Sequence, residues 1–178
     1  SKHPRYRSIT DSRTRINPTG FLVKHMTTPV LAILQARTGS RRLPNKVLLP
    51  ILEQPMLQWQ VTRLLQIPSI DRLVIATSDQ AADDAIAQVA AQAGVDCFRG
   101  DESDVLDRFY QCAKHYQAEH VVRFTGDCPL IDPAVSEQVI QLHLASNVDY
   151  TSNCMPPTYP DGLDTEIFSF SALARAWS

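Results

Sequence analysis

Residues 30–46 read VLAILQARTGSRRLPNK, an apolar run followed directly by a basic loop that contains one glycine. The run Val30–Leu34 holds no polar residue, as expected for a strand that is buried on both faces of a sheet. The loop behind it carries three arginines and a lysine, and its small residues let backbone amides approach an anion. Guanidinium groups and amide donors together suit a polyphosphate, although a solvated basic loop would have the same composition.

Apolar runs and helical patterns alternate along the rest of the chain. Further strands are predicted at 73–77, 96–98, 120–124, 148–152 and 165–168. Apolar residues at helical spacing predict helices near 57–65, 82–93, 106–116 and 135–142. This alternation predicts an α/β fold with a mostly parallel sheet that helices cover on both faces. Ligands of such sheets bind beyond the carboxyl ends of the strands.

Composition restricts the class of protein and its partners. Hydrophobic residues make up 44% of the chain and charged residues 20%, and no apolar run approaches the roughly 18 residues of a membrane span. The net charge of −2 combines +5 in residues 1–26 with −7 in residues 27–178, and so acidic a body lacks the basic face of a nucleic-acid binder. We therefore expect a cytoplasmic protein with no membrane or nucleic-acid partner and with its cysteines reduced.

The two ends of the chain differ from the body. Residues 1–26 are polar, basic and aperiodic, which predicts a disordered tail, with Met26 as the natural start of the domain. A transit peptide or a basic arm would also fit this composition. The chain stops inside a helical pattern that begins at Ser171, so we expect the domain 27–178 to lack its natural C-terminus.

A second informative segment, RFTGDCPLIDP, covers residues 123–133. Asp127 follows a buried strand and a glycine, so its carboxylate would emerge at the carboxyl edge of the sheet. A Mg²⁺ ion that is bound by one or two carboxylates and by substrate phosphates needs such a group. Alternatively, Asp127 only caps a turn and binds no metal. Asp132 suits the N-cap of the following helix.

Two further segments carry clustered acids. Residues 159–168, YPDGLDTEIF, hold Asp161, Asp164 and Glu166, which could supply a second metal ligand or bind sugar hydroxyls. Asp161 with its following glycine is also an ordinary turn, whereas Asp164 and Glu166 share one face of a strand that starts there. Residues 99–108, RGDESDVLDR, are explained largely as a helix cap with Asp107 in the first turn.

Two common nucleotide motifs are missing. The basic loop lacks the second glycine and the Lys-Ser/Thr pair of a Walker A sequence, and the chain contains no GxGxxG fingerprint. A P-loop enzyme and a dinucleotide-binding dehydrogenase are therefore disfavoured.

The segments LQARTGSRRLPNK, FRGDESDVLDRF, RFTGDCPLIDP and YPDGLDTEIFSF, in this order, resemble the cytidylyltransferase family typified by the spore coat polysaccharide biosynthesis protein SpsF. More distantly, the chain is similar to synthetases of CMP-activated sugar acids. The resemblance covers about residues 30–178 and implies a Rossmann-like, three-layer α/β/α nucleotidyltransferase domain that acts with Mg²⁺. It also implies a homodimer.

The resemblance assigns roles to residues of this chain. It implies that Arg37, Lys46 and Asp127 are the catalytic groups, with Asp127 and either Asp164 or Glu166 as metal ligands; we expect Asp164. The other expected substrate-binding residues are Gln35, Ala36, Gly39, Arg42, Asp107, Arg108, Asp161, Asp164 and Glu166.

The implied reaction is the Mg²⁺-dependent activation of a sugar or sugar acid by CTP for cell-surface polysaccharide synthesis. An acceptor oxygen would attack the α-phosphorus in line and pyrophosphate would leave, so that positioning and charge stabilisation supply the catalysis. A glycosyltransferase that uses a preformed sugar nucleotide is an alternative, but no Asp-x-Asp follows a buried strand here. A non-catalytic nucleotide-binding domain is the other alternative.

Overall fold

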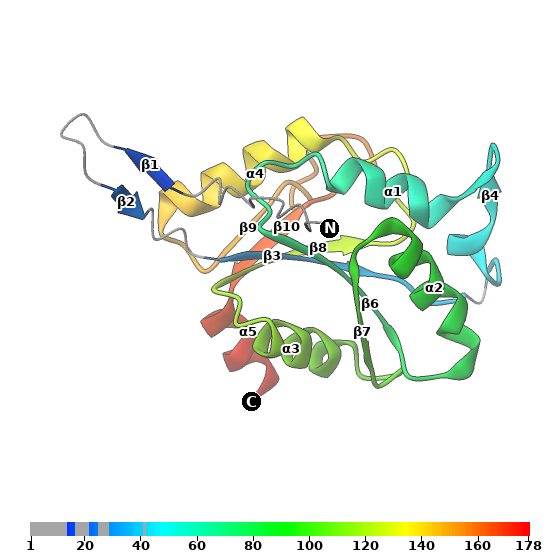
Figure 1. The fold of residues 1–178 in the computed structure, drawn as a ribbon. Coiled ribbons are helices and arrows are strands. Elements are labelled where there is room, and N and C mark those ends of the chain that lie inside the picture. The colour runs from blue at the N-terminus through cyan, green and yellow to red at the C-terminus, as the bar shows by residue number, and fades with distance from the viewer. Residues whose placement is uncertain (1–13, 17–21, 25–28, 41) are drawn as a thin grey trace, which may run out of the picture.

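The computed structural model describes residues 14–16, 22–24, 29–40 and 42–178. Its centre is a six-stranded sheet in the order β7-β6-β3-β8-β10-β9 (Figure 1). The strands are β3 (Val30–Gln35), β6 (Arg72–Ser78), β7 (Asp96–Gly100), β8 (His120–Thr125), β9 (Tyr150–Ser152) and β10 (Glu166–Ser169).

The sheet is parallel over its first four strands and antiparallel at one edge. β3 lies at the centre and pairs in parallel with β6 and β8, and β6 pairs in parallel with β7. β10 pairs antiparallel with both β8 and β9. A loop rather than a helix joins β9 to β10, and neighbouring strands joined without a crossover helix usually pair antiparallel. The predicted mostly parallel sheet is confirmed.

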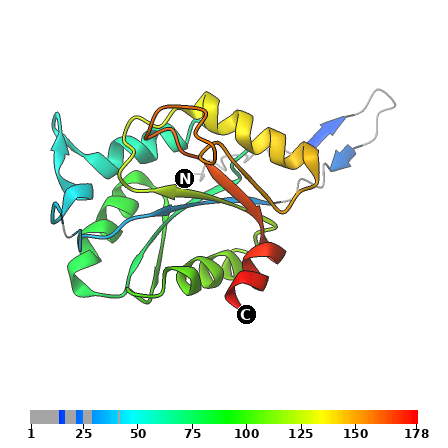
Figure 2. The ribbon, with the colours of Figure 1, turned by 180° about the vertical axis from the view of Figure 1, so that it is seen from behind.

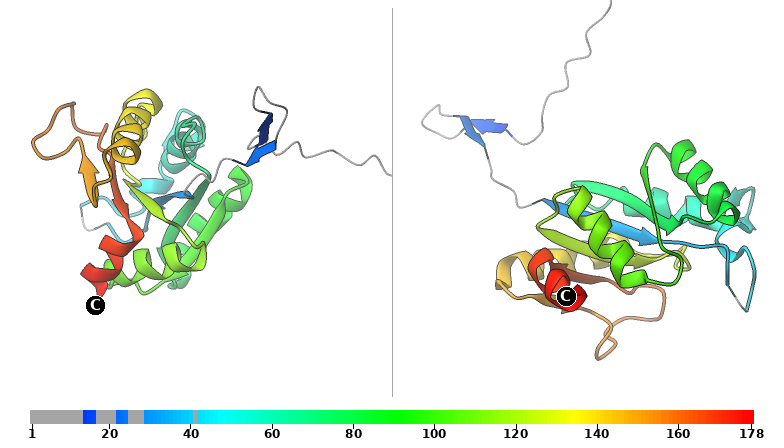
Figure 3. Two further views of the ribbon diagram at one scale, coloured as in Figure 1. Left: turned by 90° about the vertical axis from the view of Figure 1, so that its left-hand side faces the viewer. Right: turned by 90° about the horizontal axis from the view of Figure 1, so that it is seen from below.

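Helices cover both faces of this sheet. One face carries α1 (Met56–Leu64), α2 (Asp84–Ala93) and α4 (Pro133–Ser146), and the other carries α3 (Val105–His115) and α5 (Phe170–Trp177). Alternate residues of β3 pack into the two cores, Ala32 and Leu34 into one and Leu31 and Ile33 into the other. Figure 3 shows the resulting three layers end-on, and Figure 2 shows β10 running directly into α5. The three-layer α/β/α architecture is confirmed.

The remaining elements are short. Two antiparallel pairs, β1 (Thr14–Ile16) with β2 (Leu22–Lys24) and β4 (Pro50–Ile51) with β5 (Gln54–Pro55), accompany the 3₁₀ helices η1 (Lys46–Leu48) and η2 (Ala81–Asp83). Most of the expected basic tail lies outside the described residues, so its disorder stays a prediction. None of the helices in the described part of the chain has the length and apolar character that a membrane crossing requires.

Local sequence signals set several helix ends. Asp132 caps α4 by accepting hydrogen bonds from the amides of Ala134 and Val135, and Pro133 takes the first helical position. Gly94 ends α2 with a φ of 69°, a left-handed conformation that glycine adopts without strain. Asp132 thus begins α4 shortly after β8, and Gly94 ends α2 shortly before β7. Because β3, β6 and β8 pair in parallel, they end at the same edge of the sheet.

Candidate active site

A cavity of about 380 Å³ lies where β3 and β8 end, which is the edge at which parallel sheets bind ligands. Six of the predicted site residues line it: Gln35, Ala36, Arg37, Arg42, Lys46 and Asp127. Ser40, Arg123 and Thr125 complete its polar lining. The structure thus brings the basic loop and the Gly-Asp segment, which lie about 80 residues apart in the sequence, to one cavity.

The two loops touch at Gly126. Its amide donates a hydrogen bond to Gln35 O at 2.8 Å, which continues the pairing of β3 and β8 beyond their ends. A Cβ atom at Gly126 would lie 2.9 Å from Gln35 O and 3.1 Å from Ala36 Cβ, closer than packed atoms allow. The glycine is therefore required by the close approach of two backbones.

Lys46 and Asp127 form an ion pair across the cavity. Lys46 Nζ lies 2.8 Å from Asp127 Oδ2, and the two side chains are 29% and 44% exposed. The hydrogen bond from Lys46 lowers the pKa of Asp127, against the opposing effect of burial. Asp127 is therefore a partly exposed carboxylate that remains ionised at neutral pH and can accept a cation.

α1 supports the Asp127 loop from behind. Gln60 is fully buried, and its Nε2 donates to Thr125 O at 2.8 Å. Arg63 Nε donates to Ile131 O at 2.6 Å, beyond the Gly-Asp segment. These two bonds hold both ends of the loop, so Asp127 projects from a fixed backbone.

A second, smaller cavity of about 190 Å³ adjoins the first. Arg123 and Thr125 line both cavities, and Cys154, Asp164 and Glu166 line the second alone. Burial raises the pKa of the Cys128 thiol, and the charges of both Asp127 and Asp164 raise it further. Asp127 and Asp164 thus line two cavities that share Arg123 and Thr125.

Glu166 already has two polar partners. It forms an ion pair with Arg123 NH1, and its Oε1 accepts a hydrogen bond from the Tyr150 hydroxyl at 2.7 Å. Asp164 is exposed. Of the two acids that sequence left open as the second metal ligand, Asp164 is the freer to take that place.

The donor set fits a Mg²⁺ ion that substrate phosphates help to hold. The described residues contain no group of three or more His, Cys, Asp or Glu side chains that could bind a metal alone. Asp127 and Asp164 supply hard carboxylate oxygens, and Mg²⁺ is commonly held by one or two carboxylates together with phosphates. The residues present therefore suit a metal that enters with the nucleotide.

Four of the predicted site residues line neither of the two cavities. Asp107 accepts hydrogen bonds from Trp177 Nε1 at 2.9 Å and Gln111 Nε2 at 3.0 Å, so it faces α5. Arg108 is 1% exposed and donates from NH1 to Asp101 O. Burial lowers the pKa of Arg108, and the charge of Arg37 lowers it further. Gly39 and Asp161 are exposed positions that do not line the two cavities.

Sequence reasoning missed Arg123. This residue, which begins the segment RFTGDCPLIDP, lines both cavities. Its signal is a single charged residue inside the otherwise apolar end of a strand, between Val122 and Phe124. Glu166 on the neighbouring strand β10 pairs with this charge.

Comparisons with known proteins point to one family. The sequence profile of the cytidylyltransferase family matches residues 31–178. The chain is 40% identical over 126 residues to the spore coat polysaccharide biosynthesis protein SpsF of Bacillus subtilis, covering 68% of this chain and 52% of that protein. It is 32% identical over 117 residues to a 3-deoxy-manno-octulosonate cytidylyltransferase of Trichlorobacter lovleyi, covering 66% and 46%.

A solved structure shows the same fold at moderate identity. A cytidylyltransferase from Leptospira borgpetersenii is 33% identical and superposes with a TM-score of 0.77, over 85% of this chain and 63% of that one. The chain spans about half the length of the two curated relatives.

Proposed function

The chain belongs to the cytidylyltransferase family, and from this membership we propose that it transfers a cytidylyl group from CTP to a sugar or sugar acid, with release of pyrophosphate. The observation that carries the proposal is the meeting of Arg37, Arg42 and Lys46 with Asp127 in one cavity at the carboxyl edge of the sheet. Cationic side chains beside an acidic metal ligand are what a triphosphate and its divalent ion need.

The basic loop would bind the triphosphate. Arg37 is exposed next to the end of β3, and Arg42 lines the same cavity. Guanidinium groups bind phosphate oxygens through paired hydrogen bonds, which fix orientation as well as charge. In this arrangement the α-phosphorus faces the acceptor while the β- and γ-phosphates lie against the loop.

Asp127 and Asp164 would hold Mg²⁺, with Asp127 as the principal ligand. The ion, when bound, supplies charge neutralisation on the phosphates. Lys46 lies within hydrogen-bond distance of Asp127, so its ammonium can move between that carboxylate and an incoming phosphate without leaving the cavity. The protein's own contribution is thus to place three cations around the leaving group.

The acceptor would be a sugar or a sugar acid that serves a cell-surface polysaccharide. One relative is named for the cytidylyl transfer to 3-deoxy-manno-octulosonate, and another for spore coat polysaccharide biosynthesis. Arg123 and Glu166 line the smaller cavity beside Asp164 and offer both signs of charge to an acceptor. A homodimer remains a prediction from the family resemblance, and a cytoplasmic location remains a prediction from the composition.

Pyrophosphate release from CTP tests the proposal. We expect the chain, with Mg²⁺, to release pyrophosphate when a sugar or sugar acid is added, and to form the corresponding CMP-sugar in equal amount. A glycosyltransferase would instead release a nucleotide from a preformed sugar nucleotide. CTP binding without pyrophosphate release, across a panel of acidic and neutral sugars, would favour a non-catalytic nucleotide-binding domain.

A further inference from the structure

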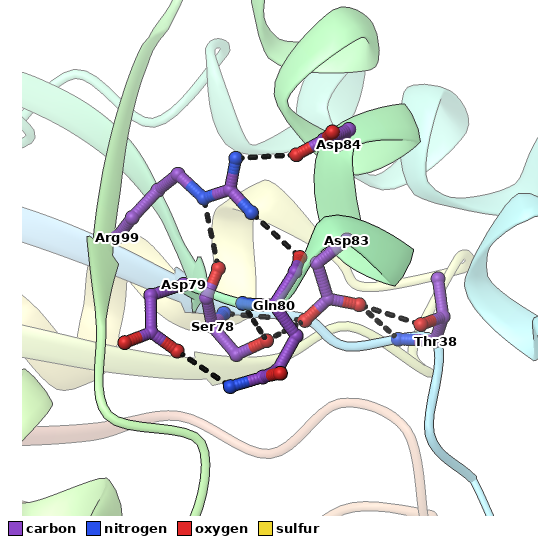
Figure 4. Close-up of polar contacts among 7 residues, drawn as sticks. All are labelled: Thr38, Ser78, Asp79, Gln80, Asp83, Asp84 and Arg99. Atoms are coloured by element: carbon purple, nitrogen blue, oxygen red, sulfur yellow. Dashed lines mark hydrogen bonds and ion pairs between the residues drawn. The ribbon is translucent and has the colours of Figure 1, made fainter.

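Asp83 is a buried carboxylate that lies outside the candidate active site. It is 2% exposed and occupies the N-cap position of α2, where an aspartate usually accepts hydrogen bonds from its own helix. Its side chain makes no such cap bond. Instead it points toward the basic loop and the end of β6, as Figure 4 shows.

Each oxygen of Asp83 binds a different segment. Oδ1 accepts hydrogen bonds from the Thr38 amide at 2.8 Å and from Thr38 Oγ1 at 2.6 Å. Oδ2 accepts from the Ser78 amide at 3.2 Å and from the Ser78 hydroxyl. Burial alone would raise the pKa of Asp83, but the hydrogen bonds from Ser78 and Thr38 outweigh it and lower the pKa to about 2. The carboxylate is therefore ionised at neutral pH and has four donors.

Thr38 in turn closes the basic loop. Its carbonyl oxygen accepts hydrogen bonds from the Ser40 amide at 2.8 Å and from the Asn45 amide at 2.9 Å. Thr38 is 6% exposed and does not line the cavity, whereas residues on both sides of it do. Both ends of the loop therefore meet at a residue that Asp83 holds by its amide and its hydroxyl.

We propose that Asp83 is a positioning residue, which anchors Thr38 and thereby holds the loop that carries Arg37, Arg42 and Lys46 in its phosphate-binding shape. This inference rests on the proposed function, because it assigns Asp83 a part in binding the triphosphate. An ordered loop does not lose conformational freedom when the nucleotide arrives, so more of the contact energy appears as affinity.

The chemistry of the site requires a carboxylate. Four donors converge on two acceptor oxygens, and hydrogen bonds to an ionised group are stronger than those to a neutral one. An amide in this place would offer one oxygen and turn its NH₂ group toward a second pair of donors. The side chain at position 83 would then lose its contact with either Thr38 or Ser78.

Binding of CTP and of CMP separates this role from a purely structural one. In isothermal titration calorimetry of the full chain with Mg²⁺, Asp83→Asn and Thr38→Val should each weaken CTP binding about ten-fold, the loss expected for a hydrogen bond to a charged group. CMP affinity should stay unchanged, because CMP lacks the β- and γ-phosphates. Thr38→Ser, which keeps the hydroxyl, should bind CTP as the wild type does.

The matched control is Asp84→Asn. Asp84 is the next residue, is 58% exposed and pairs with Arg99 NH1 rather than with the loop. It should leave the affinities for CTP and CMP unchanged. Simple destabilisation by Asp83→Asn would lower the number of binding sites for both nucleotides and leave the ratio of the two affinities intact.

An unchanged ratio in both Asp83→Asn and Thr38→Val would overturn the inference. If the wild type binds no CTP, the proposed function fails, and amide hydrogen exchange of the free chain then decides on the anchor alone. Faster exchange at Ser40 and Asn45 in Thr38→Val would support it, since their amides bond to the Thr38 carbonyl. Exchange as slow as in the wild type would refute it.

Discussion

Lys46 Nζ donates a hydrogen bond to Asp127 Oδ2 at 2.8 Å, and this contact joins the loop that follows β3 to the loop that follows β8. The ammonium thus contacts a carboxylate that we propose as a metal ligand. We expect the pair to separate on ligand binding, Lys46 toward a phosphate and Asp127 toward the metal.

Asp127→Asn should abolish Mg²⁺-dependent turnover while leaving the fold intact. The amide keeps the shape but loses the charge that binds the ion, and the loss of such an electrostatic group costs about 100-fold or more in kcat. Pyrophosphate release measures the rate, and circular dichroism checks the fold.

Asp96→Asn is the matched control for that variant. Asp96 begins β7, at the opposite edge of the sheet, and pairs with Arg72 on the surface. Its turnover should equal that of the wild type. Wild-type turnover in Asp127→Asn would refute the metal assignment.

Arg37→Ala and Arg42→Ala should each raise the KM for CTP by about ten-fold, because each removes a charged donor to a phosphate. The KM for the acceptor should not change. Arg175→Ala removes a cation that pairs with Asp149, away from the cavity, and should leave both constants as they are. An unchanged KM for CTP in both loop variants would mean that the basic loop is only a solvated surface.

Gly126→Ala should lower the free energy of unfolding by about 1–3 kcal/mol, the usual cost of forcing an extra carbon into a packed site. The added Cβ would lie 2.9 Å from Gln35 O, an atom of the backbone that has little room to move. Gly39→Ala is the control for urea denaturation, since its Cβ would lie 3.5 Å from Glu102 Oε1, an ordinary contact. Equal unfolding free energies for the two variants would contradict the close approach seen here.

A pair of histidines, one buried and one half-buried, should make stability fall in mild acid. His120 Nδ1 lies 3.0 Å from His143 Nε2, and His143 Nδ1 lies 3.0 Å from Thr151 Oγ1. Burial lowers the pKa of both rings, and the His120 charge lowers that of His143 further, against the weaker opposing charges of Glu119 and Asp149. The unfolded chain therefore takes up protons at a higher pH than the folded chain does.

The direction in which the unfolding free energy changes with pH follows from this difference. The pair's contribution is complete above the unfolded histidine pKa, near 6.5, and is lost as the pH falls below it. Urea denaturation between pH 7 and pH 5 should show the unfolding free energy decreasing, with a smaller decrease in His120→Asn. Equal slopes for the two proteins would show that the pair does not govern this pH range.

Much of the fold could be predicted because its strands are buried on both faces. Continuous apolar runs such as Val30–Leu34 are distinctive, and the helices between them have clear apolar stripes. The antiparallel direction of β10, which lies between β8 and the edge strand β9, could not be predicted, because strand direction depends on which neighbour a strand reaches in space. The alternation of strand and helix patterns along the sequence does not indicate the direction of a strand in the sheet.

The candidate site was only partly predictable for a similar reason. Three of the site residues follow strands of the parallel sheet: Arg37, Lys46 and Asp127. Because such sheets bind ligands at the carboxyl ends of their strands, the sequence could predict that these residues lie close together. The pairing of Arg123 with Glu166 depends on the register of β8 against β10, which only the structure supplies. Asp83 was not predicted at all: it stands at the N-cap position of α2, but its partners Thr38 and Ser78 lie 45 and five residues earlier in the chain.

The central claim, that this cavity binds CTP with Mg²⁺, is tested most directly by thermal unfolding of the purified chain with CTP, UTP, ATP and GTP, each with and without Mg²⁺. Binding to the folded state alone raises Tm according to the affinity of each nucleotide. We predict a rise in Tm that is largest for CTP and is increased by Mg²⁺. No rise with any nucleotide, or an equal rise with all four whether or not Mg²⁺ is present, would contradict the account.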